Sequence, residues 1–195
     1  VDVKMCGDLD NLVTDVATGR VAVEKTDKDT KNAKMEVTTA CDVKGVHVYL
    51  RVADPNARAV EDGFAGGKGT EMYFAPGLYR PYICMNSDPR EGVRDAFHTT
   101  YDSFANSRID VEGVNEPDAF RSETAFTDGD YVLHMTFSWD TFYRELPVDG
   151  SKWRFECIAF RPKGGFTLGG SEGVHNSSKW CDLEFRLAKD DIAAI

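Results

Sequence analysis

The sequence lacks the features that would place the chain in a membrane or on nucleic acid. Its 195 residues contain no apolar run near the roughly 18 residues that a membrane-spanning helix needs. Only 23 lysine and arginine residues stand against 33 aspartate and glutamate residues, which gives a net charge of -10. Because such a surface repels phosphate groups, we expect neither a membrane span nor a nucleic-acid partner.

Cysteine is scarce, and its spacing is not that of a zinc knuckle or a thioredoxin-type pair. Four of the five cysteines lie in apolar, strand-like runs, and the odd number leaves at least one unpaired. We therefore interpret them as small buried side chains rather than as a disulfide framework. Helical periodicity is also scarce, since no stretch of about eleven residues has clean helical spacing.

The chain is instead rich in alternation of apolar and polar residues, which is typical of half-buried strands. Turn sequences such as TDGD at 127–130 separate the alternating runs. The pattern predicts nine strands: Gly19–Glu24, Ala33–Ala40, Val46–Ala53, Thr70–Ala75, Tyr82–Asn86, Ala119–Phe126, Tyr131–Ser138, Trp153–Arg161 and Trp180–Leu187. We expect one domain over residues 1–195, an all-β, antiparallel, jelly-roll-like β-sandwich.

Two long segments interrupt the strands. Residues 54–69 are acidic and rich in glycine, and the segment from Ser87 to Pro117 carries several aromatic and charged residues. Both are predicted to be loops, and loops of this length are often functional. A short helix is predicted around Ser138–Arg144, with Ser138 as its cap. Because the sequence begins at Val1 rather than Met, we expect a processed chain or one excised from a longer protein.

Candidate catalytic groups are few. The sequence has no G-x-S-x-G elbow, and its glycine-rich GGFTLGG does not open a helix, so neither a serine nucleophile nor a phosphate site is indicated. His47 and His134 lie in predicted strands, opposite the aliphatic residues, and we expect them to face solvent. His98 and His175 lie in predicted loops, where functional residues concentrate.

Loop aromatics and acidic residues are the stronger signals for a ligand. Sugars present C–H faces that pack on aromatic rings, and hydroxyls that need planar polar partners. Phe64, Tyr79 and Tyr82 lie in or beside loops, so together they suggest a binding face. Asp54 and Asp62 belong to an acidic run that is either a solvated face or a source of oxygen ligands for a structural calcium ion.

Six segments, taken in order, carry a resemblance to a known family: VHVYLRVAD, GTEMYFAPG, YICMN, DYVLHMTFSWDTF, KWRFECIAFRP and GVHNSSKWCDLEF. Over residues 46–187 the chain resembles the family 9 carbohydrate-binding modules and their DOMON-like relatives. The resemblance implies a non-catalytic β-sandwich that binds a poly- or oligosaccharide at one rim, often with structural Ca2+. It also implies a flanking glycan-degrading enzyme and a secreted, periplasmic or cell-surface location.

The resemblance also assigns residues. Glu71 matches a family glutamate that hydrogen-bonds the sugar, and the loop around Val174 and His175 matches one wall of the site. Where some members hold a sugar between two tryptophans, this chain has Phe64 and Val174. Trp180 matches an aromatic residue of the core.

We accordingly expect Phe64, with Tyr79 or Tyr82, to stack on a saccharide. Glu71, Arg161 and His175 are the expected partners of its hydroxyl groups.

Two alternatives remain at this stage. DOMON-like sandwiches can hold haem, here between His175 and either Met72 or Met85. A polysaccharide lyase or hydrolase is the other alternative. Its base and charge-neutralising group would come from three residues of the second long segment: Arg94, His98 and Tyr101.

Overall fold

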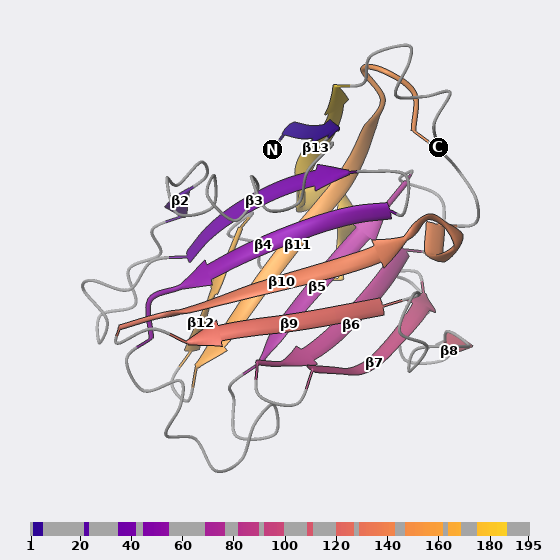
Figure 1. Ribbon diagram of the computed structural model, residues 1–195. Helices are drawn as coiled ribbons and strands as arrows, with labels where there is room; N and C mark the ends of the chain where they lie inside the picture. The colour runs from indigo at the N-terminus through magenta and orange to yellow at the C-terminus, as the bar shows by residue number, and fades with distance from the viewer. Residues whose placement is uncertain are drawn as a thin grey trace.

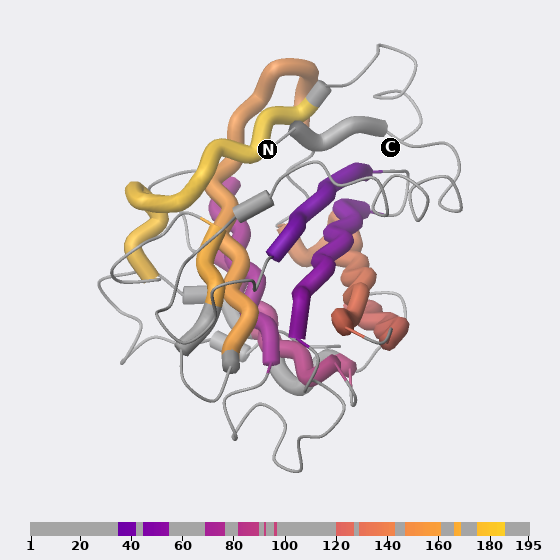
Figure 2. Tube along the Cα trace, turned by 90° about the vertical axis from the view of Figure 1, so that its left-hand side faces the viewer, coloured from indigo at the N-terminus to yellow at the C-terminus, as the bar shows by residue number. Residues whose placement is uncertain are grey.

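The alternating pattern of the sequence corresponds to two packed layers of strands in the computed structural model (Figures 1 and 2). The structure describes residues 2–5, 22–23, 35–41, 45–54, 69–76, 82–89, 92–99, 109–110, 120–126, 129–142, 147–161, 164–168 and 175–186. Their strands are β1 (Asp2–Met5), β2 (Ala22–Val23), β3 (Met35–Cys41), β4 (Gly45–Val52), β5 (Thr70–Ala75), β6 (Tyr82–Asp88), β7 (Gly92–Thr99), β8 (Ile109–Asp110), β9 (Phe120–Phe126), β10 (Tyr131–Ser138), β11 (Lys152–Arg161), β12 (Gly164–Thr167) and β13 (Cys181–Arg186).

The strand order confirms the predicted antiparallel β-sandwich. One sheet has the order β8-β7-β6-β5-β11-β13, and the other has the order β3-β4-β10-β9. β1 lies between β13 and β3 and pairs with both in parallel, so a continuous hydrogen-bonded path connects the two sheets (Figure 1). Every other pairing among the described strands is antiparallel.

The main core lies between the two sheets. Leu133, Met135 and Phe137 of β10 are fully buried, while the residues between them are half-buried, as the alternation predicts. Aromatic side chains from both sheets contact one another in this core: Phe74, Phe137, Phe142, Trp153, Phe155 and Phe185. Burial of each such ring contributes about 2 kcal/mol, which makes this interface the main source of stability.

The cysteines in the described part of the chain confirm the interpretation as small packed side chains. Cys41, Cys84 and Cys157 are free and buried, and Cys181 is free and partly buried. Burial raises the pKa of the Cys157 thiol, so that thiol stays protonated at neutral pH.

Two predictions about the connecting segments are wrong. The segment from Ser87 to Pro117 contains β7, which pairs with β6 over seven residue pairs, and also β8. β7 reads GVRDAFHT, and this sequence does not alternate cleanly between apolar and polar residues. The strand was therefore missed, because backbone pairing with β6 rather than an apolar stripe defines it. The predicted helix at 138–144 is a single 3-10 turn, η4 (Trp139–Phe142), in which the Thr141 hydroxyl donates to the Ser138 carbonyl at 2.7 Å.

No helix in the described ranges combines the length and apolar character that a bilayer crossing requires.

The prediction that His47 faces solvent is also wrong. His47 is 1% exposed on the outer face of the second sheet, and its Nδ1 lies 3.1 Å from Nε2 of His134. Thr136 Oγ1 lies 3.3 Å from the first of these nitrogens and 3.4 Å from the second. Tyr49 stacks on His134 with ring centroids 4.2 Å apart. Burial and the neighbouring His47 lower the pKa of His134 to about 4, so the His134 ring is uncharged at neutral pH.

Candidate functional site

The candidate site lies on the outer face of the first sheet, where β5, β6 and β11 are neighbours. Residues at every second position of these strands share this face, and the strand register aligns them in rows. Glu71 of β5 lies opposite Asn86 of β6 and Ile158 of β11. One row further, Tyr73 lies opposite Cys84 and Glu156. Positions far apart in the sequence therefore gather on a small area of the sheet.

A buried aromatic group covers part of this face. Tyr73, Tyr82 and Trp180 are at most 2% exposed, and they form a second apolar cluster separate from the inter-sheet core. The rings of Tyr82 and Trp180 meet edge to face with centroids 5.0 Å apart, and Tyr73 lies 5.4 Å from Trp180. Trp180 is thus buried, as the resemblance implies, but in the outer cluster. The rings provide a rigid base for the polar groups around them.

Two polar side chains sit at the border of the aromatic group. Glu71 and His175 are both half-buried, and both contact Tyr73. The Tyr73 hydroxyl donates to the Glu71 carboxylate, while the His175 ring meets the Tyr73 ring edge to face at 5.6 Å. The carboxylate and the imidazole are therefore placed around one tyrosine, with solvent access on the side away from the sheet.

The Tyr82 hydroxyl fixes the orientation of His175. Its Oη lies 2.6 Å from Nδ1 of His175. Burial raises the pKa of the Tyr73 and Tyr82 hydroxyls, so both keep their protons. Burial also lowers the pKa of His175 below 6.5, which favours the neutral ring at neutral pH. A neutral ring that accepts a hydrogen bond from the tyrosine hydroxyl at Nδ1 carries its own proton on Nε2. The Nε2–H group can then donate a hydrogen bond to a ligand.

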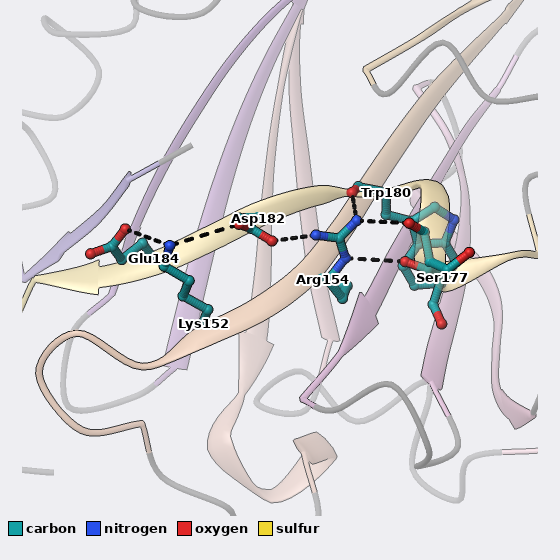
Figure 3. Close-up of polar contacts among 7 residues, drawn as sticks. Lys152, Arg154, Ser177, Trp180, Asp182 and Glu184 are labelled. Atoms are coloured by element: carbon teal, nitrogen blue, oxygen red, sulfur yellow. Dashed lines mark hydrogen bonds and ion pairs between the residues drawn. The ribbon is translucent and has the colours of Figure 1, made fainter.

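His175 and Trp180 belong to one short turn, η5 (Ser177–Lys179) with its flanking residues. Asn176 caps the turn, because its Oδ1 accepts from the Ser178 amide at 3.2 Å and from the Ser178 hydroxyl at 2.7 Å. On the other side of the turn, three backbone carbonyls accept from the guanidinium of Arg154 on β11 (Figure 3). The turn is therefore hydrogen-bonded at its start and along its carbonyls.

The structure brings together three of the predicted site residues, Glu71, Tyr82 and His175. Tyr82 is 2% exposed beneath His175 and Trp180, so it supports the histidine and offers no open ring for stacking. Arg161 ends β11, and its side chain lies outside the described part of the structure. Phe64 and Tyr79 lie outside the described residues altogether.

Sequence reasoning missed several residues of this face. Tyr73 follows Glu71 by two positions, so strand alternation could have placed it beside the glutamate. No pattern in the sequence indicated the role of Glu156. Its side chain is fully buried, and its Oε1 accepts from the amides of Cys157 at 2.9 Å and Leu168 at 2.8 Å. It satisfies these donors where β11 changes its neighbour from β13 to β12.

The predicted haem ligands do not assemble in the described residues, and of the two predicted metal ligands only Asp54 lies within them. Asp54 is buried just after β4, and Asp62 lies outside the described ranges. No group of three or more histidine, cysteine or acidic side chains that could hold a metal ion occurs within those ranges, and the calcium site, which includes Asp62, stays a prediction. Met72 and Met85 lie in the inter-sheet core, whereas His175 lies on the outer face, and the two sides cannot share one haem.

Comparison with solved structures shows the same fold. A family 9 carbohydrate-binding module from Caldicellulosiruptor kristjanssonii in complex with glucose matches with a TM-score of 0.60 and 12% identity, over 97% of each chain. A family 9 module of that organism with cellotriose gives 0.56 and 13% identity, over 97% of this chain and 95% of the other. A candidate carbohydrate-binding protein from Bacteroides uniformis gives 0.65 and 9% identity, over 95% and 98%. The chain therefore has a β-sandwich fold like that of family 9 modules. No protein-family model and no curated protein matches the sequence.

Proposed function

We propose that the protein is a saccharide-binding module whose site is formed by Glu71 and His175 above the aromatic group of Tyr73, Tyr82 and Trp180. The observation that carries this proposal is the placement of a carboxylate acceptor and an imidazole donor around one buried tyrosine. Sugar hydroxyls both donate and accept, so they match such a mixed pair. The likeness in fold to modules solved with glucose and cellotriose supports the same ligand class.

The charge of the face favours neutral sugars. Glu71 is partly exposed, whereas the guanidinium of Arg154 is engaged with backbone carbonyls and with Asp182. A uronic acid would bring a second carboxylate near Glu71, with an energetic cost that salt only partly screens. We therefore propose neutral gluco-oligosaccharides as the first ligands to test.

The decisive experiment is calorimetry of the intact chain with glucose, cellotriose and a panel of other neutral and acidic glycans. We expect dissociation constants of roughly micromolar to millimolar, because desolvation of hydroxyls offsets much of the gain. Glu71→Gln keeps an oxygen that accepts from Tyr73 but loses the charge, and we expect it to weaken binding by about tenfold.

Glu123→Gln is the matched control. Glu123 lies on β9, on the outer face of the other sheet, and its side chain is 52% exposed. This variant is expected to bind like the wild type. Absence of binding to every glycan, or equal losses in the two variants, would contradict the proposal.

The wider setting is also part of the proposal. A module of this kind increases the local concentration of an attached catalytic domain on its polymer, so we propose that the chain acts beside a glycan-degrading enzyme. Such an enzyme meets its polymer outside the cytoplasm, which favours a secreted, periplasmic or cell-surface location. Pull-down of the untagged chain on insoluble cellulose, with and without competing cellotriose, tests the binding step of this role.

A further inference from the structure

The guanidinium of Arg154 makes an unusual number of bonds to one short turn (Figure 3). Its Nε donates to the Ser177 carbonyl at 3.1 Å, and its Nη2 donates to the Ser178 carbonyl at 3.2 Å and to the Trp180 carbonyl. Its Nη1 donates to the Asp182 carboxylate. A single side chain of β11 therefore holds the backbone of the turn at three points.

These bonds supply partners for carbonyl groups that the turn itself leaves without one. η5 is one 3-10 turn of three residues, and such a turn leaves most of its carbonyls without partners inside the helix. A cation at the carbonyl end is favourable, and only arginine has a planar set of donors that can serve several carbonyls together. The lysine ammonium carries its three donors on a single nitrogen, so it matches carbonyls spread along a turn less well than the planar guanidinium does.

The position of this turn decides where the groups of the candidate site lie. Trp180 packs on Tyr73 and Tyr82, and His175 precedes the Asn176 cap and bonds to the Tyr82 hydroxyl. We propose that Arg154 is a positioning residue of the saccharide site, which fixes the 175–180 segment over β5 and β6 without itself contacting the sugar. This inference rests on the proposed function for its ligand readout, although its structural readout does not.

Lys152 is a matched control for Arg154. It lies two positions earlier on the same face of β11, and its ammonium pairs with Asp182 at 3.8 Å and with Glu184 at 3.5 Å (Figure 3). The described contacts of Lys152 all go to β13, so its removal takes away a surface charge without releasing the turn. Ion pairs of this exposed kind contribute little to stability.

The test compares Arg154→Ala, Arg154→Lys and Lys152→Ala in the intact chain. NMR titration of the His175 imidazole, without sugar, reports whether the ring keeps its buried place on Tyr82. We expect its pKa to rise toward 6.5 in R154A, to rise part of the way in R154K, and to stay unchanged in K152A. Calorimetry with cellotriose is expected to show about a tenfold loss for R154A and no loss for K152A.

An unchanged His175 titration in a folded R154A variant would overturn the inference. If R154A does not fold, R154K provides the test. A rise in the His175 pKa of R154K relative to K152A supports the inference, and an equal His175 pKa in the two variants overturns it. If the wild type binds no glycan while R154A still shifts the His175 titration, the proposed function fails and the positioning role stands. If glycan binds equally to all three variants, the positioning role fails and the proposed function stands.

Discussion

At the scale of single residues, polarity does not decide which side chains of this protein are buried. His47, Asp88 and Glu156 are each at most 1% exposed, although all three are polar or ionisable. Each lies on a strand, and for His47 and Glu156 neighbouring side chains or backbone amides supply hydrogen bonds. For Glu156 the acceptor role toward two amides explains the burial.

The lowered pKa of His134 predicts a pH-dependent stability. His134 has a pKa lowered to about 4 in the folded chain, against an ordinary value of 6.5. Above 6.5 the ring is neutral in both states; as the pH falls toward 4 the unfolded chain binds the proton first, and stability falls by on the order of 2 kcal/mol. His134→Gln removes this titration. Urea unfolding at about pH 7 and about pH 4.5 should show a smaller loss for the variant than for the wild type, and equal losses would contradict the assignment.

The candidate site was predictable from the sequence only in part. Glu71 and His175 follow from the resemblance, and alternation alone could have added Tyr73. The role of Tyr82 was not predictable, because a strand tyrosine is a stacking surface or a support depending on what lies above it. Here His175 and Trp180 come from a segment about 95 residues later in the chain, and no local pattern reports that contact.

At the scale of elements, alternation predicted the strands that have one face in the inter-sheet core. β10 is the plainest case, with buried and half-buried residues alternating along its length. β7 and β12 were not predicted: β12 reads GGFT, and half of it is glycine, so there is no apolar stripe to detect. β7 pairs with the edge of β6, and β12 pairs with the edge of β11. Their positions therefore depend on the neighbouring strand and not on a pattern in their own sequences.

The pairing of β4 with β10 predicts that Gly45 cannot carry a side chain. A Cβ at Gly45 would lie 1.9 Å from the Phe137 carbonyl oxygen, which is far inside contact distance. We expect Gly45→Ala to lower the free energy of unfolding by at least about 2 kcal/mol, because the strands must separate locally. Gly129→Ala is the control, since its Cβ would meet no atom within 4 Å. Equal denaturation midpoints for the two variants would be the contrary result.

At the scale of the whole molecule, β1 is the only described strand that pairs with both sheets. Its register joins Val3 to Phe185 on one side and to Thr39 on the other. Without these two ladders the sheets would be held together by core packing and by contacts such as the 3.1 Å hydrogen bond between Ser87 and Ser122. β1 therefore contributes to the stability of both layers at once.

Proline substitution tests this role. Val3→Pro removes a backbone donor from a strand that has neighbours on both sides, and we expect a loss of at least about 2 kcal/mol. Asp149→Pro is the control, because Asp149 is the second residue of a turn closed by the Ser151 amide and the Val148 carbonyl at 2.9 Å, with Gly150 at φ +77. Proline is favoured at that position. Thermal unfolding should separate the two variants, and a V3P midpoint equal to that of D149P would argue against the role of β1.

The parallel pairing of β1 also has a consequence for biosynthesis. Asp2 pairs with Glu184 and Lys4 with Arg186, so β1 is synthesised long before its partner β13. Hairpins such as β3–β4 and β9–β10 can form during translation, because their partners are adjacent in the chain. The link between the layers closes only after β13 has emerged. Until then the edge of β1 that pairs with β13 is open, and this edge is the surface that a chaperone would need to protect.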